Sequence, residues 1–365
     1  MFTASLGIFL LGLLCAAAGG FVGAAIGGNF AFALTGFSVL FAWGVNVTPV
    51  GAHLGLDPTV AFNYIAFGPF MGPHVAFAGG AAAAAYAAHK RYIESGKDAT
   101  SPLAGLGKVD VLLVGAGFGM LGYLIQLGIS EIPWLGGHTD SVALTVLLSA
   151  IIARLAFGNS AVGKASLFNT EKLRTDKKAH GGFMGKWDTD EDNAWLKYQE
   201  TPAQFTAIGI FFGIAAAGAA LMLAINFPAM AGNAATFAFG ISAIIILFLI
   251  IGWDMPVQHH VTISAGLAAV LFFPILAGKA DQGLAYYATL KETGMDSNAW
   301  LTAVGAILVG AFFGWVGALL AEVFQRVWYA RGTTHIDPPA SSIWLNTTLI
   351  WIAAGLFGFA GAWAA

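Results

Sequence analysis

The sequence predicts an all-α integral membrane protein of about ten transmembrane helices, arranged as two inverted five-helix repeats. The class follows from composition: of the 365 residues, 58% are hydrophobic and only 10% are charged, whereas a soluble domain carries about 25% charged residues. A soluble protein of this size has too little interior to hide so much apolar surface. The repeat follows from short motifs that recur in the same order in both halves of the chain.

Ten windows are apolar over about the 20 residues that a helix needs to cross a bilayer. The stretch 47–65 after the second window is broken by Pro49, Asp57 and Pro58. We expect it to form an external loop or a re-entrant segment that lines a cavity. The windows cover residues 5–26, 29–46, 66–88, 109–127, 141–158, 204–226, 234–252, 259–278, 299–324 and 341–363.

The distribution of Lys and Arg predicts the orientation. With the N-terminus outside and ten crossings, 14 of the 16 Lys and Arg residues fall on the cytoplasmic side, and only Lys279 and Lys291 fall outside. This is the bias of the positive-inside rule. We therefore expect both termini outside a prokaryotic cytoplasmic (inner) membrane, which suits the short loops. The lipid bilayer is then the main partner, and the net charge of −3 offers no basic field for nucleic acid.

Three regions follow: a first five-helix repeat over 1–158, a cytoplasmic linker over 159–203 and a second five-helix repeat over 204–365. The linker is the long hydrophilic segment of the chain and mixes both signs of charge. We expect a solvated connection, with a short surface helix over 191–199 that carries Trp195 and Tyr198. A linker that lies on the membrane surface or binds a partner is the alternative.

Four pairs of motifs carry the internal repeat. Residues 114–122 (VGAGFGMLG) match 309–317 (VGAFFGWVG), with six of nine positions identical. The other pairs are 138–141 with 335–338, 73–80 with 259–266, and 30–32 with 237–239. Each match is weak alone because Gly and Ala are common here, but all four occur in the same order. Together they predict a duplicated unit.

Five helices are an odd number, so the second unit must enter the membrane with the opposite orientation. Inverted repeats are typical of transporters and channels, whose sites lie near the midplane where the halves meet. The arrangement resembles the five-plus-five architecture of urea transporters and ammonium channels, without a sequence signature of either family. The resemblance implies transport but no particular solute.

A His-x-Asp pair opens a helix in each half, His138 with Asp140 and His335 with Asp337. Both aspartates fit N-cap positions, which is a purely structural role. The functional alternative places these helix starts part-way into the membrane, where His and Asp would face a cavity and bind a cation, a proton or a polar solute.

His74 and His260 form a second pair at matched positions, and Asp254, Gln258 and His259 lie close to His260 in the sequence. Ionisable residues in membrane segments are costly, so we expect these side chains to line a solute or ion pathway. The structural alternative is a histidine that locks two helices together by a hydrogen bond. Histidine also titrates near neutral pH, which allows coupling to protons. The spacing gives no tight metal-ligand signature, so metals and cofactors stay undetermined.

The first functional hypothesis is a channel or secondary transporter for a small polar or ionic solute, rather than an enzyme. The second is a membrane-embedded enzyme that acts on a lipid or lipid-linked substrate, with His-x-Asp as metal ligands or as acid and base. The third is a structural membrane subunit of a larger complex. Assembly into a homo-oligomer is compatible with each of them.

Overall fold

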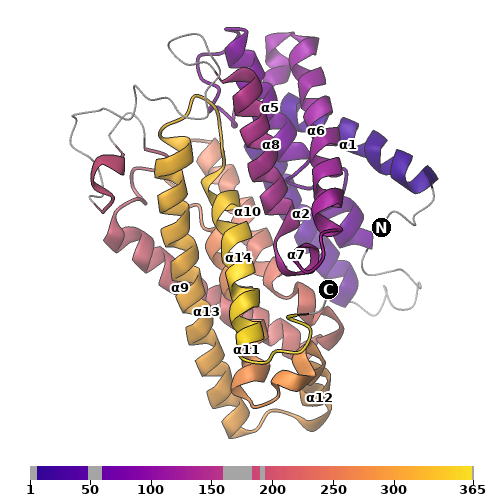
Figure 1. Ribbon diagram of the computed structural model, residues 1–365, viewed down its shortest axis with the longest axis vertical. Helices are drawn as coiled ribbons and strands as arrows, with labels where there is room; N and C mark the ends of the chain where they lie inside the picture. Colours follow the sequence, from indigo (N-terminus) through magenta and orange to yellow (C-terminus); the bar gives the residue numbers. More distant parts are fainter. Residues whose placement is uncertain (1–5, 48–59, 159–182, 190–193, 364–365) are drawn as a thin grey trace.

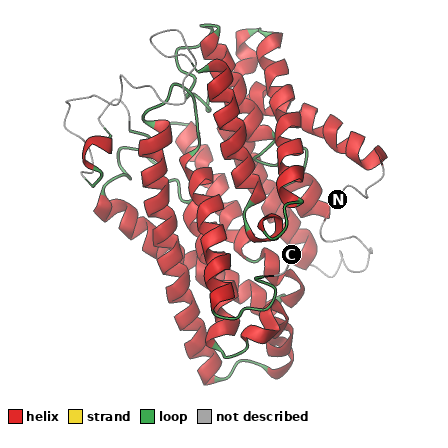
Figure 2. Ribbon diagram, in the orientation of Figure 1, coloured by secondary structure: helices red, strands yellow, loops and turns green. Residues whose placement is uncertain are grey.

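The computed structural model describes residues 6–47, 60–158, 183–189 and 194–363. Over these residues the chain is all-α, with helices joined by loops and no strand (Figure 2). The prediction of an all-α fold is therefore confirmed. Figure 1 shows the first half of the chain in one part of an elongated bundle and the second half beside and below it.

Each of the ten apolar windows contains one of the longer helices of the described chain. The first half holds α1 (Leu6–Ile26), α2 (Gly28–Val47), α5 (Ala76–His89), α6 (Val109–Ser130) and α8 (Ser141–Phe157). The second half holds α9 (Pro202–Asn226), α10 (Ala235–Ile250), α11 (His259–Leu276), α13 (Ser297–Phe324) and α14 (Pro338–Leu356). Shorter pieces connect them: η1 (Ala61–Ala66), η2 (Leu103–Leu106), α7 (Leu135–His138), η4 (Gly185–Trp187), η5 (Pro228–Asn233), η6 (Ala280–Ala285), α12 (Tyr286–Thr293) and η7 (Gln325–Tyr329).

Six helices of the described chain are long and apolar enough to cross a membrane, namely α1, α2, α6, α9, α11 and α13 with its extension η7. These helices make the chain a plausible membrane protein. Helices α8 and α10 are apolar but shorter. Burial differs sharply among the six, because 83% of the α11 window is buried against 22% of the α6 window. Helix α11 is therefore the central helix of the second half.

The third window differs from the prediction. Helix α5 begins only at Ala76, and residues 67–75 form turns and bends. Pro69 and Pro73 explain the break, because proline removes a helical N–H and clashes with the preceding turn. Within the expected re-entrant stretch 47–65, residues 48–59 lie outside the described residues. Residues 61–66 form η1, a short π-helix that packs on α2.

Two sets of helices pack in the same pairings. In the first half α1, α5 and α6 contact one another, and in the second half α9, α11 and α13 do so. Glycines allow the close approach: a Cβ at Gly119 would lie 2.8 Å from the Cα of Gly20, and one at Gly314 would lie 3.0 Å from the Cα of Gly213. Contacts of α2 with α10, and of α8 with α14, join the two halves.

The described parts of the linker are packed rather than solvated. Asp188, Gln199 and Glu200 are buried. Of the expected surface helix over 191–199, residues 191–193 lie outside the described residues, and 194–200 form a bend and a turn instead of a helix. Tyr198 donates a hydrogen bond to the carbonyl oxygen of Met255 at 2.6 Å, and burial raises the pKa of its phenol to about 12, which keeps the donor protonated.

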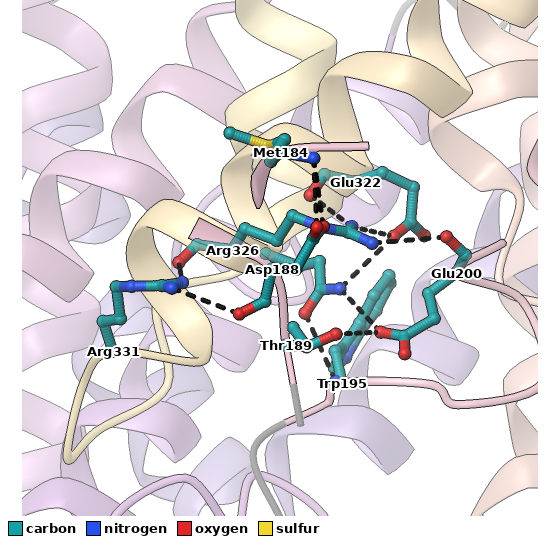
Figure 3. A network of polar contacts seen from close by, with 9 residues as sticks. Met184, Asp188, Thr189, Trp195, Glu200, Glu322, Arg326 and Arg331 are labelled. Atoms are coloured by element: carbon teal, nitrogen blue, oxygen red, sulfur yellow. Dashed lines mark hydrogen bonds and ion pairs between the residues drawn. The ribbon is translucent and has the colours of Figure 1, made fainter. Parts of the chain in front are cut away.

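A buried polar network holds this segment against the end of α13 and η7 (Figure 3). Arg326 binds the carboxylates of Asp188 and Glu322, at 3.1 Å and 2.7 Å. Gln325 donates to Glu200 at 3.1 Å and accepts from the backbone N–H of Trp195 at 3.3 Å. For residues 183–189 and 194–200 a solvated linker was the wrong expectation, because Asp188 and Glu200 find partners in Arg326 and Gln325, more than a hundred residues away in the chain. The rest of the linker, 159–182 and 190–193, lies outside the described residues.

Candidate functional site

A cavity of about 210 Å³ lies between the two halves, with walls from α2, α5, α8, α10, α11 and α14. Four residues that the sequence singles out line it: Asp140, His259, His335 and Asp337. The remaining walls are mainly apolar, and their aromatic rings belong to Phe32, Phe67, Phe77, Trp195 and Phe239.

Both aspartates cap helices, as their sequence context predicts. Asp140 accepts a hydrogen bond from the backbone N–H of Ala143 at 2.8 Å, and Asp337 accepts one from that of Ala340 at 2.7 Å. An N-cap carboxylate satisfies an otherwise unpaired N–H and interacts favourably with the helix dipole. The same two side chains line the cavity. Each aspartate therefore caps a helix and faces the cavity at the same time.

Helices α8 and α14 run antiparallel and overlap along their N-terminal halves. The backbone N–H of Asp140 donates to Thr347, in the middle of α14, at 3.1 Å. At the other end, Ile336 packs with Leu147 and Ala150, in the middle of α8. Each helix therefore begins beside the middle of the other one. The helix starts, with their aspartates, consequently lie within the bundle rather than at its surface.

His335, Asp337 and His259 form a cluster on one side of the cavity. Nε2 of His335 lies 3.2 Å from Oδ1 of Asp337, and its Nδ1 lies 3.3 Å from the carbonyl oxygen of Lys97. The His259 ring packs against Phe32, with 4.7 Å between ring centroids. Nδ1 of His259 is buried without a hydrogen-bond partner among the described residues. This nitrogen is available to a bound molecule.

His74 lines a second cavity of about 650 Å³, which belongs to the first half of the chain. Gln126 and Ser141 supply further polar groups to its wall. The two cavities share Phe67 and Val142 as lining residues. These two side chains therefore form a thin partition between the cavities.

Four predicted residues lie elsewhere. The His138 ring contacts the carbonyl oxygens of Trp134 at 2.6 Å and Gly361 at 2.8 Å, so it ties α7 to the C-terminal turns. Asp254 is exposed, in the loop before α11. Gln258 and His260 are buried at the start of α11 and do not line either of the two cavities. The described residues contain no group of three or more His, Cys, Asp or Glu that could hold a metal ion.

Sequence reasoning missed the aromatic walls, although the repeat motifs contained the signal. Extending three of the four motif matches by a few residues pairs many cavity residues with one another. The pairs that line the cavity are Asn29 with Thr236, Phe32 with Phe239, Pro73 with His259, Phe77 with Ile263, Asp140 with Asp337, Ala143 with Ala340, and Val146 with Ile343. Matched positions of the two halves therefore face one common space.

These features describe an all-helical protein with six candidate membrane-spanning helices and a cavity between the two halves of the chain. The chain belongs to the Family of unknown function (DUF7973), whose model matches residues 3–363. No curated protein and no solved structure matches the chain.

Proposed function

We propose that this protein is a channel or secondary transporter that moves a small polar or ionic solute between two inverted repeats, residues 1–158 and 204–365. The observation that carries the proposal is the cavity between the halves, with the cap aspartates of α8 and α14 in its wall. Ionisable side chains inside a membrane bundle most often mark a solute or ion path.

The packing of the helices supports the inverted repeat. Helix α5 relates to α1 and α6 as α11 relates to α9 and α13. Gly122 of α6 abuts the carbonyl oxygen of His74, and a Cβ at the matched Gly317 of α13 would lie 3.1 Å from that of His260. The same close contact thus recurs at positions that the motif matches pair.

Contacts between loops support ten crossings, because loops predicted on the same side of the membrane touch each other. His335 bonds to Gly96, and both belong to loops predicted on the cytoplasmic side. The indole N–H of Trp134 donates to Ala362, and Lys291 donates to Asn226, between segments predicted on the external side. We place the protein in the cytoplasmic membrane of a prokaryote on the charge bias described above.

The proposed path runs from the cavity at His74, past the partition of Phe67 and Val142, into the cavity at Asp140 and Asp337. Trp195 of the linker and His335 both lie in the wall of the cavity at Asp140 and Asp337. His259 also lies in this wall, and because histidine is a side chain that can shuttle protons, proton coupling belongs to this proposal.

Flux into reconstituted liposomes tests the proposal. A panel of small cations, anions and neutral solutes is followed by light scattering, and proton movement by an enclosed pH dye. Val142→Trp fills the partition, so we expect it to abolish flux of any solute that the native protein carries. The matched control is Leu113→Trp, since Leu113 is 58% exposed on α6 and faces away from the path.

Absence of flux for the whole panel, or unchanged flux in Val142→Trp, would contradict the proposal. The double variant His74→Ala/His260→Ala tests the histidines separately. Unchanged flux and unchanged pH dependence in that variant would remove both side chains from the mechanism.

A further inference from the structure

We infer that the ligand of the cavity between the two halves is a small alkylammonium cation. This inference rests on the function proposed above and names its substrate class. Charge is the first argument. Asp140 and Asp337 line the cavity, whereas none of its lining residues is Lys or Arg. A chamber with two carboxylates and no fixed positive side chain favours cations over anions.

The aromatic rings are the second argument. Phe32 contacts Phe77 and Phe239 edge to face, at centroid separations of 6.1 Å and 5.7 Å. Phe67 contacts Phe239 as well, at a centroid separation of 5.7 Å. Ring faces attract cations that carry apolar groups, and clusters of such rings recognise methylated ammonium groups. The rings and the carboxylates line the same space.

Polarity favours an organic cation over a metal ion. The part of the chain that the structure describes contains no group of three or more His, Cys, Asp or Glu that could hold a metal ion, and most of the cavity wall is apolar. A weakly hydrated alkylammonium ion loses less on entering an apolar chamber than a bare inorganic cation does. The volume of about 210 Å³ lies below the range of about 300–1,000 Å³ for drug-sized ligands, so the ligand is small.

His335 is the cavity histidine that contacts Asp337 directly, and His259 lines the same wall. Its two ring nitrogens face the Lys97 carbonyl oxygen and the Asp337 carboxylate, both of which are acceptors. A protonated His335 would therefore neutralise Asp337. Binding is measured at pH 8 to limit this competition.

Binding of choline to the purified full-length protein tests the inference. Its uncharged isostere 3,3-dimethylbutan-1-ol has the same shape without the charge and serves as the matched ligand. Calorimetry on the native protein should show choline bound at least about tenfold more tightly than the isostere, a difference of one cation–π or ion-pair contact.

The variants Asp140→Asn and Asp337→Asn keep an N-cap side chain and remove only the charge. Each should weaken choline binding by about tenfold and leave the isostere unaffected. Asp281→Asn, at an exposed site outside the cavity, is the control and should bind choline like the native protein. Equal affinity for the two ligands, or unchanged choline binding in both aspartate variants, would overturn the inference.

Flux measurements separate this inference from the proposed function. If another solute crosses the liposome membrane while choline does not bind, the alkylammonium inference falls and transport stands. If choline binds with the expected charge dependence and no solute crosses, the binding site stands and transport falls.

Discussion

Arg326 donates from Nε to Asp188 at 3.1 Å, with both side chains almost fully buried. This pair fastens the linker to the end of α13 and η7. Breaking a buried pair by removing one charge leaves the other uncompensated and costs about 3–5 kcal/mol. We therefore expect Asp188→Asn to lower the thermal unfolding midpoint in detergent by several degrees. Asp281→Asn, at an exposed site, should leave the midpoint unchanged, and equal midpoints for the two variants would refute the expectation.

Two glutamates of the same network should respond differently to neutralisation. Glu322 accepts from Nη1 of Arg326 at 2.7 Å, an ion pair that Glu322→Gln removes. Glu200 accepts from neutral donors, the Thr189 hydroxyl at 2.7 Å and the Gln325 amide at 3.1 Å, which a glutamine carbonyl can replace. We expect Glu322→Gln to destabilise the protein markedly and Glu200→Gln to be tolerated. The reverse order of midpoints would contradict this account of the network.

Gly122 and Gly117 provide a contrast on a single helix. A methyl group at Gly122 would overlap the carbonyl oxygen of His74, which is backbone and cannot swing away, whereas nothing lies within 4 Å of one at Gly117. Gly122→Ala should therefore lower the yield of monodisperse protein and its midpoint. Gly117→Ala should be neutral or stabilising by about 0.5–1 kcal/mol. Similar behaviour of both variants would argue against the close contact of α6 with residue 74.

Cysteine labelling tests the orientation. The Cys15→Ser background removes the single native thiol. Lys279→Cys and Lys108→Cys are then made at exposed positions predicted outside and inside, respectively. A membrane-impermeant maleimide should label the first in intact cells and the second only after permeabilisation. Labelling of both from the same side would reject ten crossings with an outside N-terminus.

Hydropathy located all ten longer helices because each is a continuous apolar run, as α6 illustrates by filling and slightly exceeding its window of 109–127. Hydropathy missed the break over residues 67–75, since the residues around Pro69 and Pro73 are as apolar as a helix. It also could not place Asp188, whose partner Arg326 lies 138 positions away in the chain.

The residues of the candidate site were predictable where their residue type is rare in the sequence. Asp140 and Asp337 belong to a His-x-Asp pair that precedes an apolar window in each half, and both line the cavity. Phe32 and Phe239 do not stand out, because the chain holds 29 phenylalanines and many of them face away from the interior. His138 and His335 share a motif but differ in surroundings, since only His138 meets the carbonyl oxygen of Gly361.

The contact between Phe32 and Phe239 has a bearing on the ancestry of the chain. Under the proposed repeat these residues are one position in two copies, and a position that touches its own copy lies on the two-fold axis. A gene for the single unit would then have encoded a five-helix protein that dimerised through this ring. Under the proposed inversion of the repeats, its monomers would have inserted into the membrane in both directions. Fusion of two such genes would have fixed one direction for each copy and freed their histidines to diverge.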